Sequence, residues 1–213
     1  SDGSATLNFS GFSTLQGGNN TDTFNVTANS NFNLKGGAGV DVFDIGSVIL
    51  TGAVDGEADG ATLQGTGITN ATLTTAGSST GFNGNTAALT AGFANIDTLA
   101  GSGTLTGRNA ASTWTLDGSP AYSDGSATLN FSGFSTLQGG ANIDTFTLAS
   151  GITSFIGEIN GAGGTNALAA TDGANSWVMT SSGSGTLNGE IFTNIAQLTG
   201  GSGGIIQWLC SRH

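Results

Sequence analysis

The sequence predicts an all-β fold built from stacked repeat units, a β-solenoid with roughly 20 residues in each coil. Two observations carry this prediction. Residues 1–18 and 123–140 are identical, in a chain of 213 residues. Apolar residues also alternate with polar ones in short runs that glycine and asparagine separate. An identity of this length indicates a duplicated repeat, and such repeats fold by stacking on their neighbours.

The composition favours strands over helices. The chain has 38 glycines and one proline, with 37% hydrophobic and 8% charged residues. Its other abundant residues, Ser, Thr and Asn, are typical of turns and strands and are poor in helix interiors. The scarcity of proline suits a hydrogen-bonded ladder, because proline removes a donor. The hydrophobic content is sufficient for a buried core, which argues against a disordered chain.

Charge, hydropathy and cysteine content limit the partners and the covalent framework that we expect for this chain. The formal net charge is -11, and Lys35, Arg108 and Arg212 are the only basic residues. A phosphate backbone is bound by clustered Lys and Arg, so we expect no nucleic-acid partner. No apolar run approaches the roughly 18 residues of a membrane-spanning helix, so we expect no membrane span. Cys210 is the only cysteine, which excludes a disulfide framework.

A shorter motif, Phe-x5-Leu-x-Gly, recurs in the chain and begins at Phe9, Phe93, Phe131 and Phe192. Runs with period two mark strands that bury one face, and the glycines between them suit tight corners. We therefore expect a single domain over residues 1–204. Residues 205–213 break the pattern and resemble either a frame change or a vector-derived tail. A two-layer sandwich is the alternative fold; it explains the alternation but not the duplication.

Residues 36–44 match the calcium nonapeptide G-G-x-G-x-D-x-U-x in full. Its glycines turn carbonyls toward an ion, and its aspartate supplies a hard oxygen ligand. Two further copies of the motif have asparagine in place of the third glycine. In the alternative interpretation the aspartates form turns by accepting hydrogen bonds from their own backbone. If calcium binds, the expected ligands are Asp22, Gly36, Gly37, Gly39, Asp41, Asp44 and Asp144.

Through units such as Leu137–Gly140 followed by Asp144–Phe146, the chain resembles repetitive bacterial surface and secreted proteins of the RTX and filamentous-haemagglutinin-like adhesin type. The resemblance implies a secreted or cell-surface, right-handed parallel β-helix with a structural or adhesive role. It also implies Ca²⁺ as a cofactor and extracellular or host-surface glycans as partners. Unlike tandem RTX repeats, the motifs here are dispersed. An uncovered end of the stack would favour end-to-end self-association.

The alternatives to a structural role are a hydrolase and a carbohydrate-binding module. Residues 77–81 fit the esterase motif G-x-S-x-G, with Ser79 as the candidate nucleophile. The only histidine, His213, is the last residue. A catalytic triad would therefore require the C-terminus to pack beside Ser79. Polysaccharide-acting hydrolases also use parallel β-helices, but the carboxylates that they need are scattered here. The sequence therefore favours a protein that is not an enzyme.

Two smaller patterns have ordinary explanations. Trp114 and Trp177 could stack on sugar rings, but both lie in alternating runs, which favours a place in the core. Residues 55–60 resemble the first half of an EF-hand calcium loop. The acidic ligand expected at position twelve of that loop is Thr66, so a solvated acidic loop is the simpler interpretation.

Overall fold

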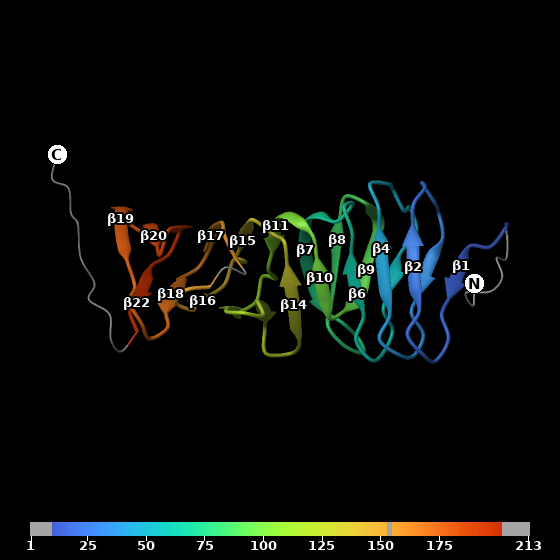
Figure 1. Ribbon diagram of the computed structural model, residues 1–213, viewed down its shortest axis with the longest axis horizontal. Coiled ribbons are helices and arrows are strands. Elements are labelled where there is room, and N and C mark those ends of the chain that lie inside the picture. The colour runs from blue at the N-terminus through green and yellow to red at the C-terminus, as the bar shows by residue number, and fades with distance from the viewer. Residues whose placement is uncertain (1–9, 153–154, 202–213) are drawn as a thin grey trace.

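The computed structural model describes residues 10–152 and 155–201, and the tail predicted at 205–213 lies outside these ranges. All regular elements in the described ranges are β-strands, which confirms the all-β prediction. These strands form a twelve-stranded and a ten-stranded sheet, stacked along the long axis of an elongated molecule (Figure 1). Within the same residues we find no helix of the length and hydropathy that crossing a membrane requires.

The two sheets, which we name A and B, run side by side along the molecule. In spatial order, sheet A contains β1 (Thr14–Gln16), β3 (Asn33–Lys35), β5 (Val54–Asp55), β9 (Leu89–Ile96), β8 (Phe82–Thr86), β7 (Thr69–Ala76), β11 (Ser102–Thr106), β15 (Thr136–Gln138), β17 (Glu158–Asn160), β21 (Glu190–Thr193), β20 (Ser184–Leu187) and β19 (Trp177–Ser181). Sheet B contains β2 (Thr23–Val26), β4 (Val42–Ile45), β6 (Thr62–Gln64), β10 (Thr98–Ala100), β14 (Thr128–Ser132), β13 (Ala121–Ser123), β12 (Ser112–Leu116), β16 (Asp144–Leu148), β18 (Ala167–Ala170) and β22 (Gln197–Thr199).

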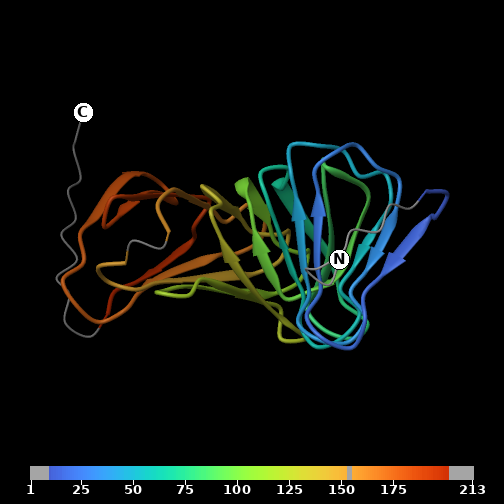
Figure 2. The same ribbon diagram turned by 45° about the vertical axis from the view of Figure 1, so that its right-hand side comes forward.

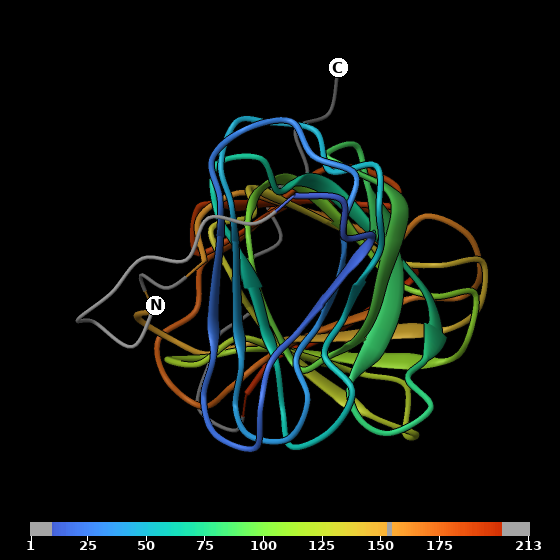
Figure 3. The same cartoon turned by 90° about the vertical axis from the view of Figure 1, so that its right-hand side faces the viewer.

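The first six strands form parallel rungs, each with one strand in sheet A and one in sheet B. Leu15 of β1 aligns with Leu34 of β3, 19 residues later, and Leu34 aligns with Val54 of β5, 20 residues later. Figure 2 shows these rungs (blue to cyan) lying side by side at one end of the molecule. Seen down the long axis, the strands surround a shared interior (Figure 3), which the apolar side chains fill.

Three antiparallel meanders interrupt the parallel rungs: β7–β9 and β19–β21 in sheet A, and β12–β14 in sheet B. Paired positions are therefore further apart in the sequence there, with 36 residues between Leu63 and Leu99. The expected spacing of roughly 20 residues holds in only part of the chain, and the sheets are mostly parallel. The turn at Asn188-Gly189 has φ of 54° and 97°, as two-residue hairpins require.

The core is a column of aligned apolar side chains. In sheet B, Phe43, Leu63 and Leu99 lie in register and are fully buried. In sheet A, Leu105, Leu137 and Ile159 do the same. Burying a side chain of this size stabilises the fold by about 1.5–3 kcal/mol. Each rung therefore depends on its neighbours for burial.

The recurring motif Phe-x5-Leu-x-Gly marks the point where a meander ends. Phe93, Phe131 and Phe192 lie in the last strands of the three meanders, β9, β14 and β21. The leucine of each motif then lies in the opposite sheet, in β10, β15 and β22. The motif is thus a crossing from one sheet to the other. Its first copy, at Phe9, begins outside the described residues.

Candidate functional site

The predicted metal ligands lie at the corner where the chain passes from sheet A to sheet B. A glycine follows the sheet A strand, and an aspartate comes immediately before the sheet B strand, as Gly36 and Asp41 do around β3 and β4. A Cβ atom on Gly36 would lie 2.3 Å from Asp41 Oδ2 and 2.8 Å from the carbonyl oxygen of Gly56 in the next rung. A side chain there would force Asp41 or the backbone at Gly56 to shift, which favours glycine at this corner.

The aspartates of these corners accept backbone hydrogen bonds within and between rungs. Gly18 N–H donates to Asp22 Oδ2 at 2.6 Å, and Asp22 N–H donates to Asp41 Oδ1 at 2.8 Å. In the second copy of the repeat, Gly140 N–H donates to Asp144 Oδ2 at 2.8 Å. This is the turn-forming role that the sequence offered as the alternative to calcium.

Asp41 departs from this pattern. Gly37 N–H donates to Glu57 Oε2 at 3.0 Å, so it does not reach the carboxyl group of its own turn. Asp41 Oδ2 is buried and has no hydrogen-bond partner. Burial is the main cause that raises the pKa of Asp41; the hydrogen bond from Asp22 opposes the rise, and the nearby carboxylates add to it.

Asn166 occupies the position of Asp41 in a later rung. Its contacts indicate which groups lie next to Asp41 Oδ2. Its Nδ2 donates to the carbonyl oxygens of Gly161 at 2.7 Å, Gly163 at 2.8 Å and Asn194 at 3.3 Å. By strand register, Gly161 and Asn194 correspond to Gly36 and Gly56. A donor therefore suits this position, whereas an ionised carboxylate would place an acceptor against acceptors.

Two of the predicted ligands, Asp44 and Asp144, form contacts separate from the Asp22–Asp41 pair. Asp44 lies in β4 between the buried Phe43 and Ile45, and its Oδ2 accepts a hydrogen bond from Gln64 Nε2 at 3.2 Å. Asp144 begins β16, near the other end of the molecule, and burial raises its pKa as well. The structure thus brings Asp22 and Asp41 together and separates them from Asp144.

The carboxylates of the acidic segment at residues 55–60 contact nearby side chains. Glu57 forms an ion pair with Lys35 at 2.6 Å, and Asp55 Oδ1 accepts from Asn95 Nδ2 at 2.7 Å. Among the described residues no group of three or more His, Cys, Asp or Glu could hold a metal ion. Calcium takes six to eight oxygen ligands, and these can include backbone carbonyl oxygens such as those of the glycine corners. Calcium binding therefore stays a prediction that rests on the motif.

The esterase motif lies in the hairpin loop between β7 and β8. Ser79 N–H donates to Asn95 Oδ1 at 3.0 Å, and Thr80 Oγ1 donates to Asp97 at 2.5 Å. The motif needs a strand-to-helix turn that exposes the nucleophile, whereas this loop joins two antiparallel strands. His213 lies outside the described residues. In the described part of the chain, Ser79 therefore lies in a hairpin loop that differs from the strand-to-helix turn of the motif.

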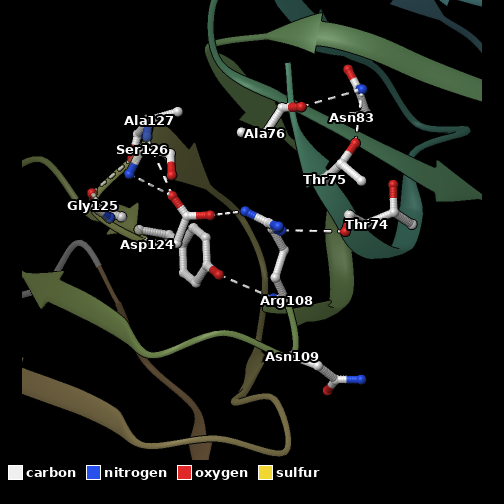
Figure 4. A network of polar contacts seen from close by, with 12 residues as sticks. Thr74, Thr75, Ala76, Asn83, Arg108, Asn109, Asp124, Gly125, Ser126 and Ala127 are labelled. Atoms are coloured by element: carbon white, nitrogen blue, oxygen red, sulfur yellow. Dashed lines mark hydrogen bonds and ion pairs between the residues drawn. The ribbon is translucent and has the colours of Figure 1, made fainter. Parts of the chain in front are cut away.

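The structure also forms a polar site around Arg108 that the sequence analysis missed. Arg108 forms an ion pair with the buried Asp124, and its Nε donates to the carbonyl oxygen of Thr74 at 3.2 Å (Figure 4). Tyr122 Oη accepts from Arg108 N–H at 3.0 Å. A pocket of about 420 Å³ lies alongside, lined by residues 72–74 and 106–109. Because Asp124 neutralises the guanidinium, the pocket offers hydroxyl groups and one paired charge.

The tryptophans of the repeat belong to the core. Trp114 is fully buried, and its ring stacks on Phe146 with centroids 5.4 Å apart. Trp177 is 5% exposed and packs edge-on against Phe192. This confirms the place predicted from their alternating runs, and it removes both rings as surfaces for sugar stacking.

Comparison with known proteins adds no assignment: no family model, no curated protein and no solved structure matches this chain.

Proposed function

We propose that this chain is a rigid segment of a larger repeat array and that its role is structural. In this proposal the rungs wind as a right-handed β-solenoid. The array belongs to a secreted or cell-surface bacterial protein, in which it spaces or presents an adhesive region that binds extracellular glycans. The resemblance to repetitive surface proteins supports the setting, and the stacking of the rungs supports the mechanical role.

The observation that carries the proposal is the continuity of the core. Aligned apolar side chains run along sheet A from Leu34 to Phe192, and they pass through the second copy of the duplicated segment without a break between copies. Two folded units joined by a linker would have separate cores instead. A continuous core with hydrogen-bonded rungs resists bending, which is what a spacer requires.

The polar contacts support a structural role better than a catalytic one. In the described ranges, both basic side chains are held in ion pairs, Lys35 with Glu57 and Arg108 with Asp124. The carboxyl groups of Asp22 and Asp144 accept backbone hydrogen bonds at corners. Groups used in this way stabilise the stack and are poorly placed for acid–base chemistry.

Small-angle X-ray scattering tests the mechanical role. We expect the chain to scatter as a rod, and two chains fused head to tail to have about twice its maximum dimension. A compact particle, or a fused pair that bends freely at the junction, would contradict the proposal. Binding of the immobilised chain to a glycan panel separates an adhesive segment from a plain spacer, since only the former retains glycans.

A further inference from the structure

The pocket beside Arg108 forms where two neighbouring strands of sheet A end at different points. Thr72 of β7 pairs with Thr106 of β11, and β11 ends there, whereas β7 continues to Ala76. Beyond this pair the sheet loses one strand, and the chain that leaves β11 passes through Arg108 and Asn109. The pocket of about 420 Å³ lies between that segment and β7. Pockets for small ligands usually enclose about 300–1,000 Å³, so this one is large enough for a small molecule.

Three contacts hold Arg108 in position at the pocket. Its backbone N–H donates to Tyr122 Oη, its Nε donates to the carbonyl oxygen of Thr74, and its Nη1 forms the ion pair with Asp124. Figure 4 shows Asp124 on one side of the guanidinium and Thr74 on the other. Asp124 is held in turn, because its Oδ1 accepts from Ser126 N–H at 2.9 Å. The guanidinium is therefore preorganised, and a ligand would not have to order it.

The remaining nitrogen of the guanidinium is free to bind a ligand. Arginine has five N–H donors, and the contacts of Nε and Nη1 use two of them. Within residues 10–152 and 155–201, Asp41 Oδ2 and Trp114 Nε1 are the only buried side-chain nitrogen or oxygen atoms without a hydrogen-bond partner. Arg108 Nη2 has no partner in these ranges either, so it reaches solvent.

Three hydroxyl groups and one amide add to this set. The side chains of Thr72, Thr74 and Thr106 line the pocket and form no hydrogen bond with another described residue. Asn109 Oδ1 accepts from Ala141 N–H at 2.9 Å, which fixes the orientation of the amide and leaves Nδ2 as a donor. The wall thus presents hydroxyl groups, which both donate and accept, beside two donors of fixed position.

The charges around the pocket favour a neutral ligand. Asp124 compensates the charge of Arg108, and the chain carries a net charge of -11, which repels anions. The lining residues, 72–74 and 106–109, include no Asp or Glu that would attract a cation. A neutral molecule with adjacent hydroxyl groups matches the wall, because each hydroxyl accepts from a fixed donor and donates to a threonine.

We propose that this pocket binds a neutral sugar unit. The proposal rests on the proposed function, since it places glycan recognition on the rungs of the array themselves. Arg108 Nη2 and Asn109 Nδ2 donate to neighbouring hydroxyl groups of the sugar. The hydroxyl groups of Thr72 and Thr106, which lie on adjacent strands about 4.8 Å apart, bind the same ring.

Nuclear magnetic resonance of the isotope-labelled full chain tests the proposal. The probes are the methyl glycosides of glucose, galactose, mannose and N-acetylglucosamine, each added to about 50 mM, because a few hydrogen bonds give millimolar affinity. We expect at least one of them to shift the resonances of the Arg108 Nε–H, the Asn109 side-chain amide and the Thr106 amide in a saturable way. Resonances of β2 and β4, in the first rungs, should not move. The absence of such shifts with all four sugars would overturn the proposal.

Three further probes test the class of ligand. Glucuronate and inorganic phosphate are anions, and N-methylacetamide supplies an acceptor without hydroxyl groups. Each should bind more weakly than the best neutral sugar. Tighter binding of either anion would show an anion site at Arg108, and equal binding of N-methylacetamide would show a site for peptide groups. Both results would overturn the proposal.

A pair of isosteric substitutions separates recognition from a structural role. Thr72→Val with Thr106→Val removes both hydroxyl groups and keeps the branched shape that suits a strand. We expect the affinity for the sugar to fall by about tenfold, with the fold unchanged. The matched control is Thr115→Val with Thr147→Val, which changes two paired threonines on adjacent strands of sheet B. An equal loss in the control, or no loss in the first pair, would overturn the proposal.

These outcomes are distinct from failure of the proposed function. A rod in scattering whose pocket binds none of the four sugars would leave the mechanical role standing and reject this site. A compact particle whose pocket binds a sugar would reject the mechanical role and keep the site. Retention on the glycan panel that the Thr72 and Thr106 substitutions do not reduce would place adhesion elsewhere and reject this site.

Discussion

The corners at Gly36–Asp41 and Gly161–Asn166 occupy the same place in their rungs and differ in one terminal group. At Asn166 an amide nitrogen donates to three carbonyl oxygens, those of Gly161, Gly163 and Asn194. At Asp41 a buried oxygen without a partner stands in its place. The comparison indicates what a carboxyl group needs at this corner. The oxygen that corresponds to Asp41 Oδ2 must bind a proton, a cation or an N–H group of its own turn.

The largest effect should come from closing the corner with a methyl group. A Cβ atom on Gly161 would lie 2.2 Å from the carbonyl oxygen of Asn194, which is backbone and cannot move aside. We expect Gly161→Ala to destabilise the protein by about 3 kcal/mol, measured by chemical denaturation. Gly36→Ala should cost less, because its nearest contact is a side-chain oxygen.

Gly118→Ala is the matched control for this pair, since nothing lies within 4 Å of a Cβ atom at Gly118. It should leave stability within about 0.5 kcal/mol of the parent protein. If Gly118→Ala and Gly161→Ala destabilised equally, the losses would reflect glycine content and not the close approach of neighbouring rungs.

The next effect should follow from placing a carboxyl group at the amide corner. Asn166→Asp removes the donor and turns an acceptor toward the carbonyl oxygens of Gly161 and Asn194. We expect a loss of about 2 kcal/mol near neutral pH, because buried polar groups are left unpaired. The loss should shrink in acid, where the introduced carboxyl group is protonated. An equal loss at both pH values would contradict the role assigned to the donor.

The reverse exchange should stabilise. Asp41→Asn supplies a donor to the carbonyl oxygens of Gly36 and Gly56, and we expect a gain of about 1 kcal/mol near neutral pH. For a chain of this length that corresponds to a rise of about 2–4 °C in melting temperature. Asp44→Asn, on the outer face of the same strand, is the control and should change little. A destabilised Asp41→Asn would mean that the carboxyl group has a partner that the amide cannot replace.

The pH dependence of stability gives a separate test of Asp41. Because burial raises its pKa above the ordinary value of 3.8, the folded state binds more protons than the unfolded state above that pH. The stabilising effect of the proton is complete below pH 3.8 and is lost as the pH rises through the raised, folded-state pKa. The advantage of Asp41→Asn should therefore vanish in acid and grow as the pH rises. Asp144, whose pKa burial also raises, contributes equally to both proteins.

Calcium should have the smallest effect. The carboxyl groups of Asp22 and Asp144 already accept backbone hydrogen bonds, so we expect millimolar calcium to shift the melting temperature by less than about 1 °C. A shift of several degrees that Asp41→Asn abolishes would establish the site that the nonapeptide predicts. It would also show that a cation supplies at Asp41 what the amide supplies at Asn166.

The sequence predicted the strands better than their order. Alternation in runs such as Thr23–Val26 and the glycines between runs determine local structure, and both are visible without a fold. The antiparallel meanders were missed because the duplication favoured uniform coils. The hairpin dipeptide Asn188-Gly189 was a signal that could have found one of them. The Arg108–Asp124 ion pair joins the turn after β11 to the loop between β13 and β14. No spacing in the sequence predicts this pair.

By itself the sequence determined that the chain is all-β, that its rungs repeat, and that aspartates follow glycine corners, because each of these depends on neighbouring residues in the chain. Only the tertiary structure decided which carboxyl groups are satisfied. Gly18 and Gly140 donate to the aspartates of their own turns, whereas Gly37 donates to Glu57, which the next rung brings into reach. That difference arises between segments 20 residues apart, where the stacking of rungs, rather than local propensity, sets which donor meets which acceptor.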